Sequence, residues 1–284
     1  MTGSPPIPSP GSLLKKYGLA PRKSWGQNFL HDARVHEEIV AASGARPGRR
    51  VLDIGAGLGT LTMHLLRSGA EVWAIERDRD LCEVLRTELR DEPRFRLFEA
   101  NAVTFDYGAV SKDSTRVAVV GNLPYQLTGE LLFALLDHDA STGVWVVMVQ
   151  QEVADRLCAS PGTKQYGAPT VSLGRTRRIE RVCQVGPGCF LPPPRVQSSV
   201  VALHPRATPL GEVADPDGYR ALVRAAFGQR RKTLQNSLSV LADKATVARW
   251  CAVADVDPTL RPERLSPASF AALQRAREAE AADA

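Results

Sequence analysis

The stretch VLDIGAGLGTLT, residues 51–62, determines the expected fold, because an apolar run ends in a glycine-rich turn and apolar residues then recur at helical spacing. This is the pattern of a buried strand, a tight turn and an amphipathic helix. We predict further strands over 71–77, 95–103, 115–125, the start of 143–159 and 201–204, and helices over 36–45, 60–69, 79–90, 129–138 and the end of 143–159. Strands and helices that alternate at this spacing predict an α/β fold with a mostly parallel, doubly wound sheet.

The pattern changes after His204. Residues 205–218 have the composition of a linker, and the segments 219–257 and 267–284 show helical periodicity without a strand pattern. The start of the chain is rich in proline and lacks the apolar core of a signal peptide. We therefore expect three regions: a flexible tail over 1–14, a sheet domain over 15–205 and a small all-helical domain over 206–284.

Composition limits the environments that suit the protein. The 284 residues are 44% hydrophobic and 24% charged, and the five cysteines form neither a CxxC pair nor a metal-ligand pattern. We expect a cytoplasmic protein with no membrane segment and no bound metal. The net charge of +5 is modest, but basic residues gather in RTRRIER (175–181) and RAAFGQRRK (224–232). Such runs are typical either of a solvated face or of a surface that binds a polyanion.

The glycines of the turn are Gly55, Gly57 and Gly59, spaced as G-x-G-x-G. Dinucleotide-binding turns have G-x-G-x-x-G, so this spacing argues against a nicotinamide-dependent oxidoreductase. Glycines without a Cβ allow a ligand to approach the backbone closely. Glu76 ends the next strand, where a carboxylate can accept hydrogen bonds from both hydroxyls of a ribose, and Asp53 lies within reach of a cationic ligand end. These features suit a nucleoside without phosphates.

This arrangement resembles the class I S-adenosylmethionine-dependent methyltransferases. Asn101, after the third strand, stands where this class usually has an aspartate beside the adenine amine, and an asparagine oxygen can still accept that hydrogen bond. The resemblance implies S-adenosylmethionine as the cofactor. The residues expected to bind it here are Asp53, Gly55, Gly57, Glu76 and Asn101.

The segment AVVGNLPYQLTGELL, residues 118–132, ends another strand with Asn122, Pro124 and Tyr125. It resembles the signature of methyltransferases that act on the exocyclic amine of adenine. The Asn122 side-chain oxygen and the Pro124 carbonyl can accept the hydrogens of this amine and direct its lone pair at a methyl group. Pro124 makes the backbone rigid, and Tyr125 offers a ring on which an extruded base can stack. Methyl transfer then requires positioning and desolvation rather than a nucleophilic residue or a metal.

Four further segments resemble the ribosomal RNA adenine dimethyltransferases: KSWGQNFLHD (23–32), QQEVADRL (150–157), FLPPPRVQSSVV (190–201) and AFGQRRKTLQNSL (226–238). The likeness is strongest to members that act on bacterial 16S ribosomal RNA. It implies a Rossmann-like class I methyltransferase sheet with a small helical domain, and dimethylation of two adjacent adenines in a small-subunit RNA hairpin during ribosome assembly. The implied partner is the small ribosomal subunit, and we expect a monomer.

The resemblance also implies roles for individual residues. Asn28 and Leu30 of the leader would close over the cofactor, with Asn122 lining its pocket. Phe190 would hold the target base against Tyr125. The basic residues expected on a helix that contacts RNA phosphates are Arg224, Arg230, Arg231 and Lys232.

Two other functions remain open at this point. The 23S ribosomal RNA methyltransferases that confer macrolide resistance share the fold and the N-x-P-Y pattern, although the PPP segment and the basic helix favour the small-subunit enzymes. A non-catalytic assembly factor with a vestigial pocket is the second, and the intact Asn122 and Tyr125 argue against it. The chain departs from the family pattern at Asn101, at Gln151 and in QLTGE (126–130), beside the expected site.

Overall fold

A computed structural model describes residues 6–22, 25–111, 116–229 and 231–282. The chain divides into two compact units, one of residues 1–154 and 180–204 and the other of residues 155–179 and 205–284. This division differs from the predicted boundary at 205/206, because the segment 155–179 belongs to the helical unit. Its side chains Tyr166 and Val171 are buried in the helical core beside Tyr219. The hydroxyl of Tyr219 donates a hydrogen bond to the Val171 carbonyl at 3.3 Å.

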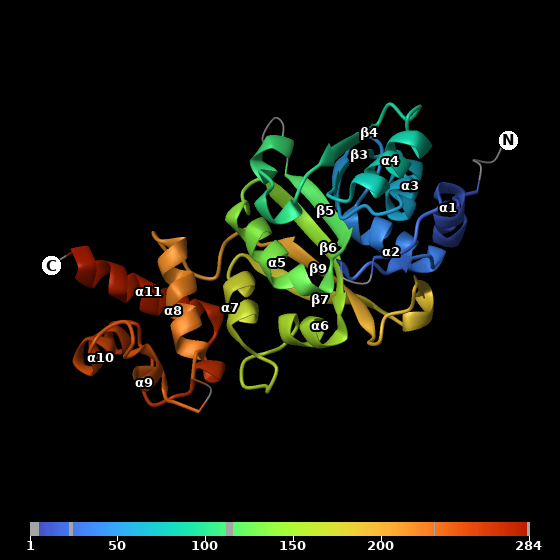
Figure 1. Cartoon of the computed structure of the whole chain (residues 1–284). Coiled ribbons are helices and arrows are strands. Elements are labelled where there is room, and N and C mark those ends of the chain that lie inside the picture. Colours follow the sequence, from blue (N-terminus) through green and yellow to red (C-terminus); the bar gives the residue numbers. More distant parts are fainter. Residues whose placement is uncertain (1–5, 23–24, 112–115, 230, 283–284) are drawn as a thin grey trace. The chain divides into compact units, whose positions relative to one another are not determined.

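A seven-stranded sheet forms the core of the first unit (Figure 1). In spatial order its strands are β4 (Phe95–Glu99), β3 (Glu71–Glu76), β2 (Arg50–Ile54), β5 (Val117–Asn122), β6 (Thr142–Gln150), β9 (Ser198–Pro205) and β7 (Arg177–Val185). Strands β4 to β6 pair in parallel, and β9 runs antiparallel to β6. The predicted α/β fold is confirmed. From β2 the chain adds β3 and β4 on one side of β2, and it then returns to add β5 and β6 on the other side. The strand order therefore reverses between β2 and β5, and sheets of this kind bind ligands at such a point.

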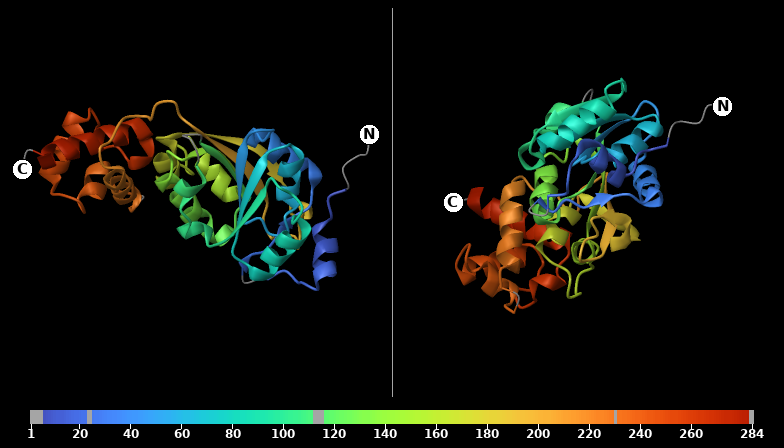
Figure 2. Two further views of the ribbon diagram at one scale, coloured as in Figure 1. Left: turned by 90° about the horizontal axis from the view of Figure 1, so that it is seen from above. Right: turned by 45° about the vertical axis from the view of Figure 1, so that its right-hand side comes forward.

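Helices cover both faces of the sheet (Figures 1 and 2). Helices α2 (Ala33–Ser43), α3 (Thr60–Arg67) and α4 (Arg79–Glu88) share one apolar cluster with the strands, and α5 (Thr128–Asp137) lies on the opposite face. Aspartate side chains at positions 32 and 78 accept backbone N–H groups of the first turns of α2 and α4. This capping, together with apolar residues at helical spacing, explains why these segments fold as helices.

The start of the chain is more ordered than predicted. Helix α1 (Pro10–Tyr17) begins after Ser9, whose side chain accepts a hydrogen bond from the Ser12 backbone N–H. The side chains of Leu13 and Leu14 are buried in a cluster with Phe29, Leu58, Leu81 and Val84. Part of the expected 1–14 tail is therefore packed against the sheet domain. Burial of each leucine side chain stabilises the fold by about 1.5–3 kcal/mol. Nearby, the short strand β1 (Phe29–Leu30) pairs antiparallel with β8 (Phe190–Leu191).

Strand β7 was not predicted. Its sequence RRIERVCQV carries charge along much of its length, and the first part was interpreted as a possible polyanion-binding run. The structure corrects that interpretation, because Arg177 is fully buried within the strand while Arg178 is exposed. The run RTRRIER is therefore partly structural.

The second unit is helical, as the periodicity indicated. Its helices are α7 (Ala168–Gly174), α8 (Pro216–Phe227), α9 (Leu234–Leu238), α10 (Lys244–Val253) and α11 (Pro267–Ala282), and α6 (Gln151–Leu157) spans the boundary between the units. No helix in the described ranges is long and apolar enough to cross a membrane. Nor do the described residues include a cluster of His, Cys, Asp and Glu side chains that could hold a metal ion.

Candidate active site

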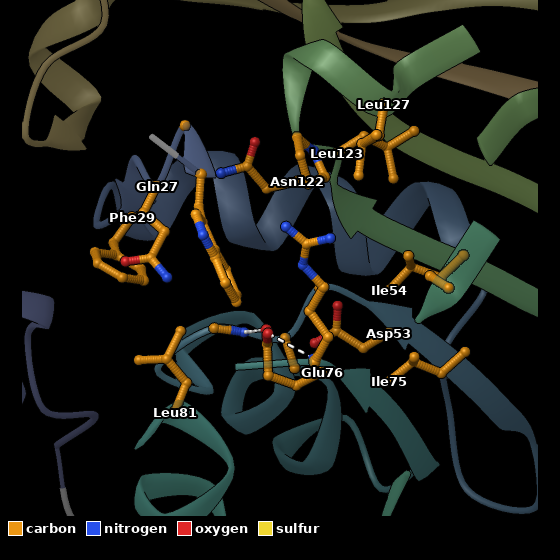
Figure 3. A pocket seen from close by; sticks show the side chains of 18 of the residues that line it. Gln27, Phe29, Asp53, Ile54, Ile75, Glu76, Leu81, Asn122, Leu123 and Leu127 are labelled. Carbon is orange, nitrogen blue, oxygen red and sulfur yellow. Dashed lines mark hydrogen bonds between the residues drawn. The ribbon is translucent and has the colours of Figure 1, made fainter. Parts of the chain in front are cut away.

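An open pocket lies at the carboxyl ends of β2, β3 and β5, where the strand order reverses (Figure 3). It is lined by the glycine loop, the strand ends and the leader segment 25–30. In Figure 3, Asn122 and Glu76 stand on opposite sides of this cavity. The predicted site residues that line it are Asn28, Leu30, Asp53, Gly55, Gly57, Glu76, Asn101, Asn122, Pro124 and Tyr125.

The glycine loop reaches the pocket because its backbone is in the left-handed region, with φ of 71° at Gly55, 60° at Gly57 and 81° at Gly59. A Cβ on Gly57 would lie 3.3 Å from the Phe29 ring, and it would narrow the pocket that both residues line. The loop thus offers backbone rather than side chain to a ligand. Such a wall suits a nucleoside that lies flat against the chain.

Glu76 is fixed by the loop that it faces. One carboxylate oxygen accepts the Gly57 N–H at 2.9 Å, and the other accepts the N–H groups of Arg77 and Asp78 at 2.8 Å each. The side chain is 8% exposed, and burial raises its pKa against the opposing effect of these three hydrogen bonds. The carboxylate is therefore held rigidly at the end of β3, and the oxygen that accepts the Gly57 N–H keeps one lone pair for a hydroxyl donor.

Asp53 is buried on β2, one strand away. Its Oδ2 accepts a hydrogen bond from the Thr62 hydroxyl at 2.7 Å, and burial raises its pKa to about 7. A cationic group placed beside it would favour the charged carboxylate. Asp53 lines the pocket, and its role toward a positive ligand end remains a prediction.

Asn101 lines the pocket, but its side-chain oxygen is already used. It caps the short 3-10 helix Ala102–Thr104 by accepting the Val103 N–H at 3.1 Å. An amide oxygen has two lone pairs, so one remains for an adenine amine. The exposed side chain also keeps its two N–H donors at the pocket rim.

Asn122 is oriented by the leader, a contact that the sequence did not predict. Its Nδ2 donates to the backbone carbonyl of Asn28 at 2.8 Å. This bond fixes which end of the carboxamide is the oxygen, and no described residue donates to that oxygen. The preceding Gly121 allows β5 to come close to β2, since a Cβ there would lie 2.5 Å from the carbonyl oxygen of Ile54. An acceptor is thus held beside the glycine loop.

Pro124 and Tyr125 continue from Asn122 into the pocket wall. The Pro124 carbonyl accepts the Leu127 N–H at 2.9 Å and the Thr128 hydroxyl at 3.3 Å. The Tyr125 hydroxyl lies 2.6 Å from the hydroxyl oxygen of Ser198 at the start of β9. The carbonyl thus has internal partners, while the phenol ring is tied in place by a residue 73 positions away.

Phe190 does not lie in the pocket. It is 3% exposed and belongs to the apolar cluster of the sheet, where it pairs with Leu30 across β1 and β8. The structure therefore does not bring Phe190 and Tyr125 together as two walls for a base. Its predicted part in holding the target remains a prediction.

The leader and Arg22 just before it contribute contacts that the sequence did not single out. Arg22 lies 2.9 Å from one oxygen of Asp78, and the Gln27 side chain donates to the other at 2.8 Å. Two guanidinium groups lie near the Trp25 ring, that of Arg77 at 4.2 Å and that of Arg22 at 5.2 Å from the ring centre. In the sequence, the resemblance of the leader motif was the one signal that included Trp25 and Gln27. These contacts fasten the leader to the end of β3, over the pocket.

The predicted basic cluster is not a helical stripe. Arg224 is exposed on α8, whereas Arg231 and Lys232 are exposed in the loop between α8 and α9, and Arg230 lies outside the described residues. Helix α8 ends at Phe227, and Thr233 then caps α9. The helix predicted for Arg231 and Lys232 was therefore wrong, whereas Arg224 does lie on a helix, and all three side chains reach solvent.

Comparison with known proteins connects this geometry to one family. The ribosomal RNA adenine dimethylase model matches residues 18–274. A ribosomal RNA small subunit methyltransferase A of Anaeromyxobacter sp. (strain K) is 47% identical over 279 residues, which is 94% of this chain and 97% of the relative. The protein of the same name from Pseudomonas aeruginosa is 43% identical and covers 92% of this chain and 96% of its own.

Two solved structures share the fold. A dimethyladenosine transferase from Plasmodium falciparum has a TM-score of 0.73 at 22% identity, covering 89% of this chain and 98% of its own. The 23S rRNA methyltransferase ErmE has a TM-score of 0.66 at 26% identity, covering 88% and 100%. A sheet of this order, with a glycine loop at the switch point and N-x-P-Y after the neighbouring strand, defines a class I methyltransferase. The chain belongs to the ribosomal RNA adenine dimethylase family and is an adenine dimethyltransferase.

Proposed function

We propose that this enzyme transfers methyl groups from S-adenosylmethionine to the exocyclic amines of two adjacent adenines in a hairpin of 16S ribosomal RNA, within the assembling small subunit. The observation that carries the proposal is the placement of the Asn122 carboxamide, oriented by the Asn28 carbonyl, in the same pocket as the Glu76 carboxylate. One group suits a target amine and the other suits the ribose of a nucleoside cofactor.

The residues present fit this cofactor. A wall of glycine backbone, a Cβ-free position at Gly57 and the fixed carboxylate of Glu76 suit adenosine, with Asn101 at the adenine side and Asp53 toward a cationic group. When bound, the cofactor would supply an electrophilic methyl group. The protein needs no nucleophile for this transfer, since it contributes positioning and exclusion of water.

Asn122 would act on the acceptor side of the reaction. Its oxygen would take one hydrogen bond from the adenine amine, which favours a pyramidal nitrogen with its lone pair available for attack. A fixed amide dipole costs no reorganisation as charge develops on that nitrogen. Tyr125, held through its hydroxyl by Ser198, would stack on the extruded base.

Affinity for the ribosome would come from a different part of the chain. We assign to the helical unit, with Arg224, Arg231 and Lys232 exposed, contacts to RNA phosphates that place the enzyme but do not select the base. Arg230 is proposed to belong to the same group. In this scheme the enzyme acts as a monomer in the cytoplasm.

The large-subunit alternative differs in substrate and not in chemistry. ErmE, a 23S enzyme, is 26% identical to this chain, whereas relatives named as small-subunit methyltransferases reach 47%. The test is methylation in vitro of undermethylated small subunits and of large subunits, followed by mapping of the modified positions. Two adjacent dimethyladenosines in 16S RNA support the proposal, and modification confined to 23S RNA would refute it.

A further inference from the structure

A histidine in the pocket wall takes no part in the contacts described above. His36, the fourth residue of α2, lines the pocket and is 2% exposed. Neither of its ring nitrogens has a hydrogen-bond partner in the part of the chain that the structure describes. A buried polar group without a partner destabilises a fold, so such a group in a binding pocket indicates a ligand that satisfies it.

The ring is held in one orientation. It stacks on His64 of α3, with ring centres 4.7 Å apart and planes inclined by 28°. Burial, followed by the charge of His64, lowers the pKa of His36 to about 3, against an opposing effect of Asp32. The imidazole is therefore neutral near pH 7, with one N–H donor and one acceptor nitrogen.

The position of His36 indicates which part of a ligand it meets. Helix α2 packs against α3, β5 and β6, whereas Glu76 ends β3 and Asn101 follows β4, on the other side of β2. Adenosine bound at Glu76 would thus leave its 5′ substituent to extend along the glycine loop toward α2. Thr60 of the pocket wall begins α3 there, and the positive end of a helix favours a carboxylate.

We propose that His36 is a cofactor-binding residue whose imidazole N–H donates a hydrogen bond to the carboxylate of the amino-acid end of the methyl donor. The inference rests on the proposed use of S-adenosylmethionine. Asp53, in the same wall, faces the ammonium of that end. The pocket then offers a hydrogen-bond donor, His36, to the carboxylate and an acid, Asp53, to the ammonium of the zwitterionic end.

The test compares two ligands that differ only in the part assigned to His36. S-adenosylhomocysteine carries the amino-acid end, and 5′-methylthioadenosine lacks it. His36→Phe keeps a ring to stack on His64 and removes both nitrogens. Calorimetry should show S-adenosylhomocysteine binding weakened about 10- to 100-fold, as expected for one hydrogen bond to a charged group, with 5′-methylthioadenosine unchanged. His36→Gln, which restores a donor, should recover part of the loss.

His138→Phe is the matched control, because His138 also contacts an aromatic ring, that of Tyr107 with ring centres 5.6 Å apart, and is absent from the pocket wall. It should alter neither affinity. Thermal unfolding without ligand should show His36→Phe at least as stable as the wild type, since an unsatisfied buried group is removed. If His36→Phe weakened the binding of both ligands equally, or left the affinity for S-adenosylhomocysteine unchanged, the role of His36 would be refuted and the proposed function would stand. A wild-type protein that binds neither ligand would instead remove the proposed function.

Discussion

Replacing Asn122 with alanine separates the chemical step from substrate binding. The side chain has two functional groups: its Nδ2–H donates to the Asn28 carbonyl at 2.8 Å, and its oxygen is left as an acceptor in the pocket. Alanine removes both. The Asn28 carbonyl then lacks its partner, and the target amine lacks the group that orients its lone pair.

The two losses have different sizes. Removal of one preorganised polar contact to a reacting group lowers kcat by about 10²–10³-fold. The lost hydrogen bond to Asn28 reduces the free energy of unfolding by about 1 kcal/mol, which corresponds to a Tm about 2–4 °C lower. Such a variant stays folded at assay temperature. Ribosome affinity should change little, because we assign it to cations of the helical unit.

The assay is incorporation of radioactive methyl groups into undermethylated small subunits under single-turnover conditions, with subunit binding measured in parallel. Gln184→Ala is a suitable control, because it deletes an exposed carboxamide on β7 away from the pocket. We expect normal turnover for that variant and loss of turnover with retained binding for Asn122→Ala. Wild-type turnover in Asn122→Ala would refute the acceptor role. Loss of both turnover and subunit binding would refute the assignment of catalysis to the sheet unit and of ribosome binding to the helical unit.

Three further predictions concern charge, pH and the tyrosine. Reversal of Arg224, Arg231 and Lys232 to glutamate should weaken subunit binding and reduce the salt slope by about 0.7–0.9 per lost phosphate contact; unchanged binding would assign these residues to a solvated surface. Burial raises the pKa of Asp53 from 3.8 to about 7, so the folded protein binds the Asp53 proton more tightly than the unfolded chain does. The free energy of unfolding should therefore be highest below about pH 4 with respect to this group and should fall as the pH rises from about 4 to 7. Asp53→Asn should remove up to about 1.4 kcal/mol per pH unit of that slope in urea titrations, and parallel curves for both proteins would contradict the shift. Tyr125→Phe and Ser198→Ala should each lower kcat/KM, and the double variant should lose less than the sum, with a coupling energy of about 0.5–1.5 kcal/mol; additive losses would show that the hydroxyl pair does not position the ring.

The sequence predicts those parts of the molecule in which local pattern and structure agree. Apolar runs that end in polar residues gave the parallel strands and the residues at their carboxyl ends. Strand β7 escaped because charged residues occupy a strand whose Arg177 is nonetheless buried by tertiary packing. The break between α8 and α9 escaped because apolar spacing continues through Arg231 and Lys232, while the actual end is set at Phe227 and a new cap at Thr233.

Contacts between distant segments lie beyond such reasoning. Asn122 and Asn28 are 94 positions apart, and Tyr125 and Ser198 are 73 apart. Motif resemblance placed Asn28 near the cofactor without indicating that its backbone carbonyl orients the carboxamide. The same limit applies to Phe190, whose motif matches the family but whose side chain lies in the core.

The departure QLTGE bears on which acceptor acts in methyl transfer. Thr128 is 3% exposed, and its hydroxyl donates to the Pro124 carbonyl, which also accepts the Leu127 N–H. Both lone pairs of that carbonyl are thus engaged within the turn, so an amine could bind there only by displacing or sharing a bond. The Asn122 oxygen has no such competitor among the described residues. We therefore expect orientation of the target amine to depend chiefly on Asn122, while the residues after it hold the Pro124 carbonyl in place.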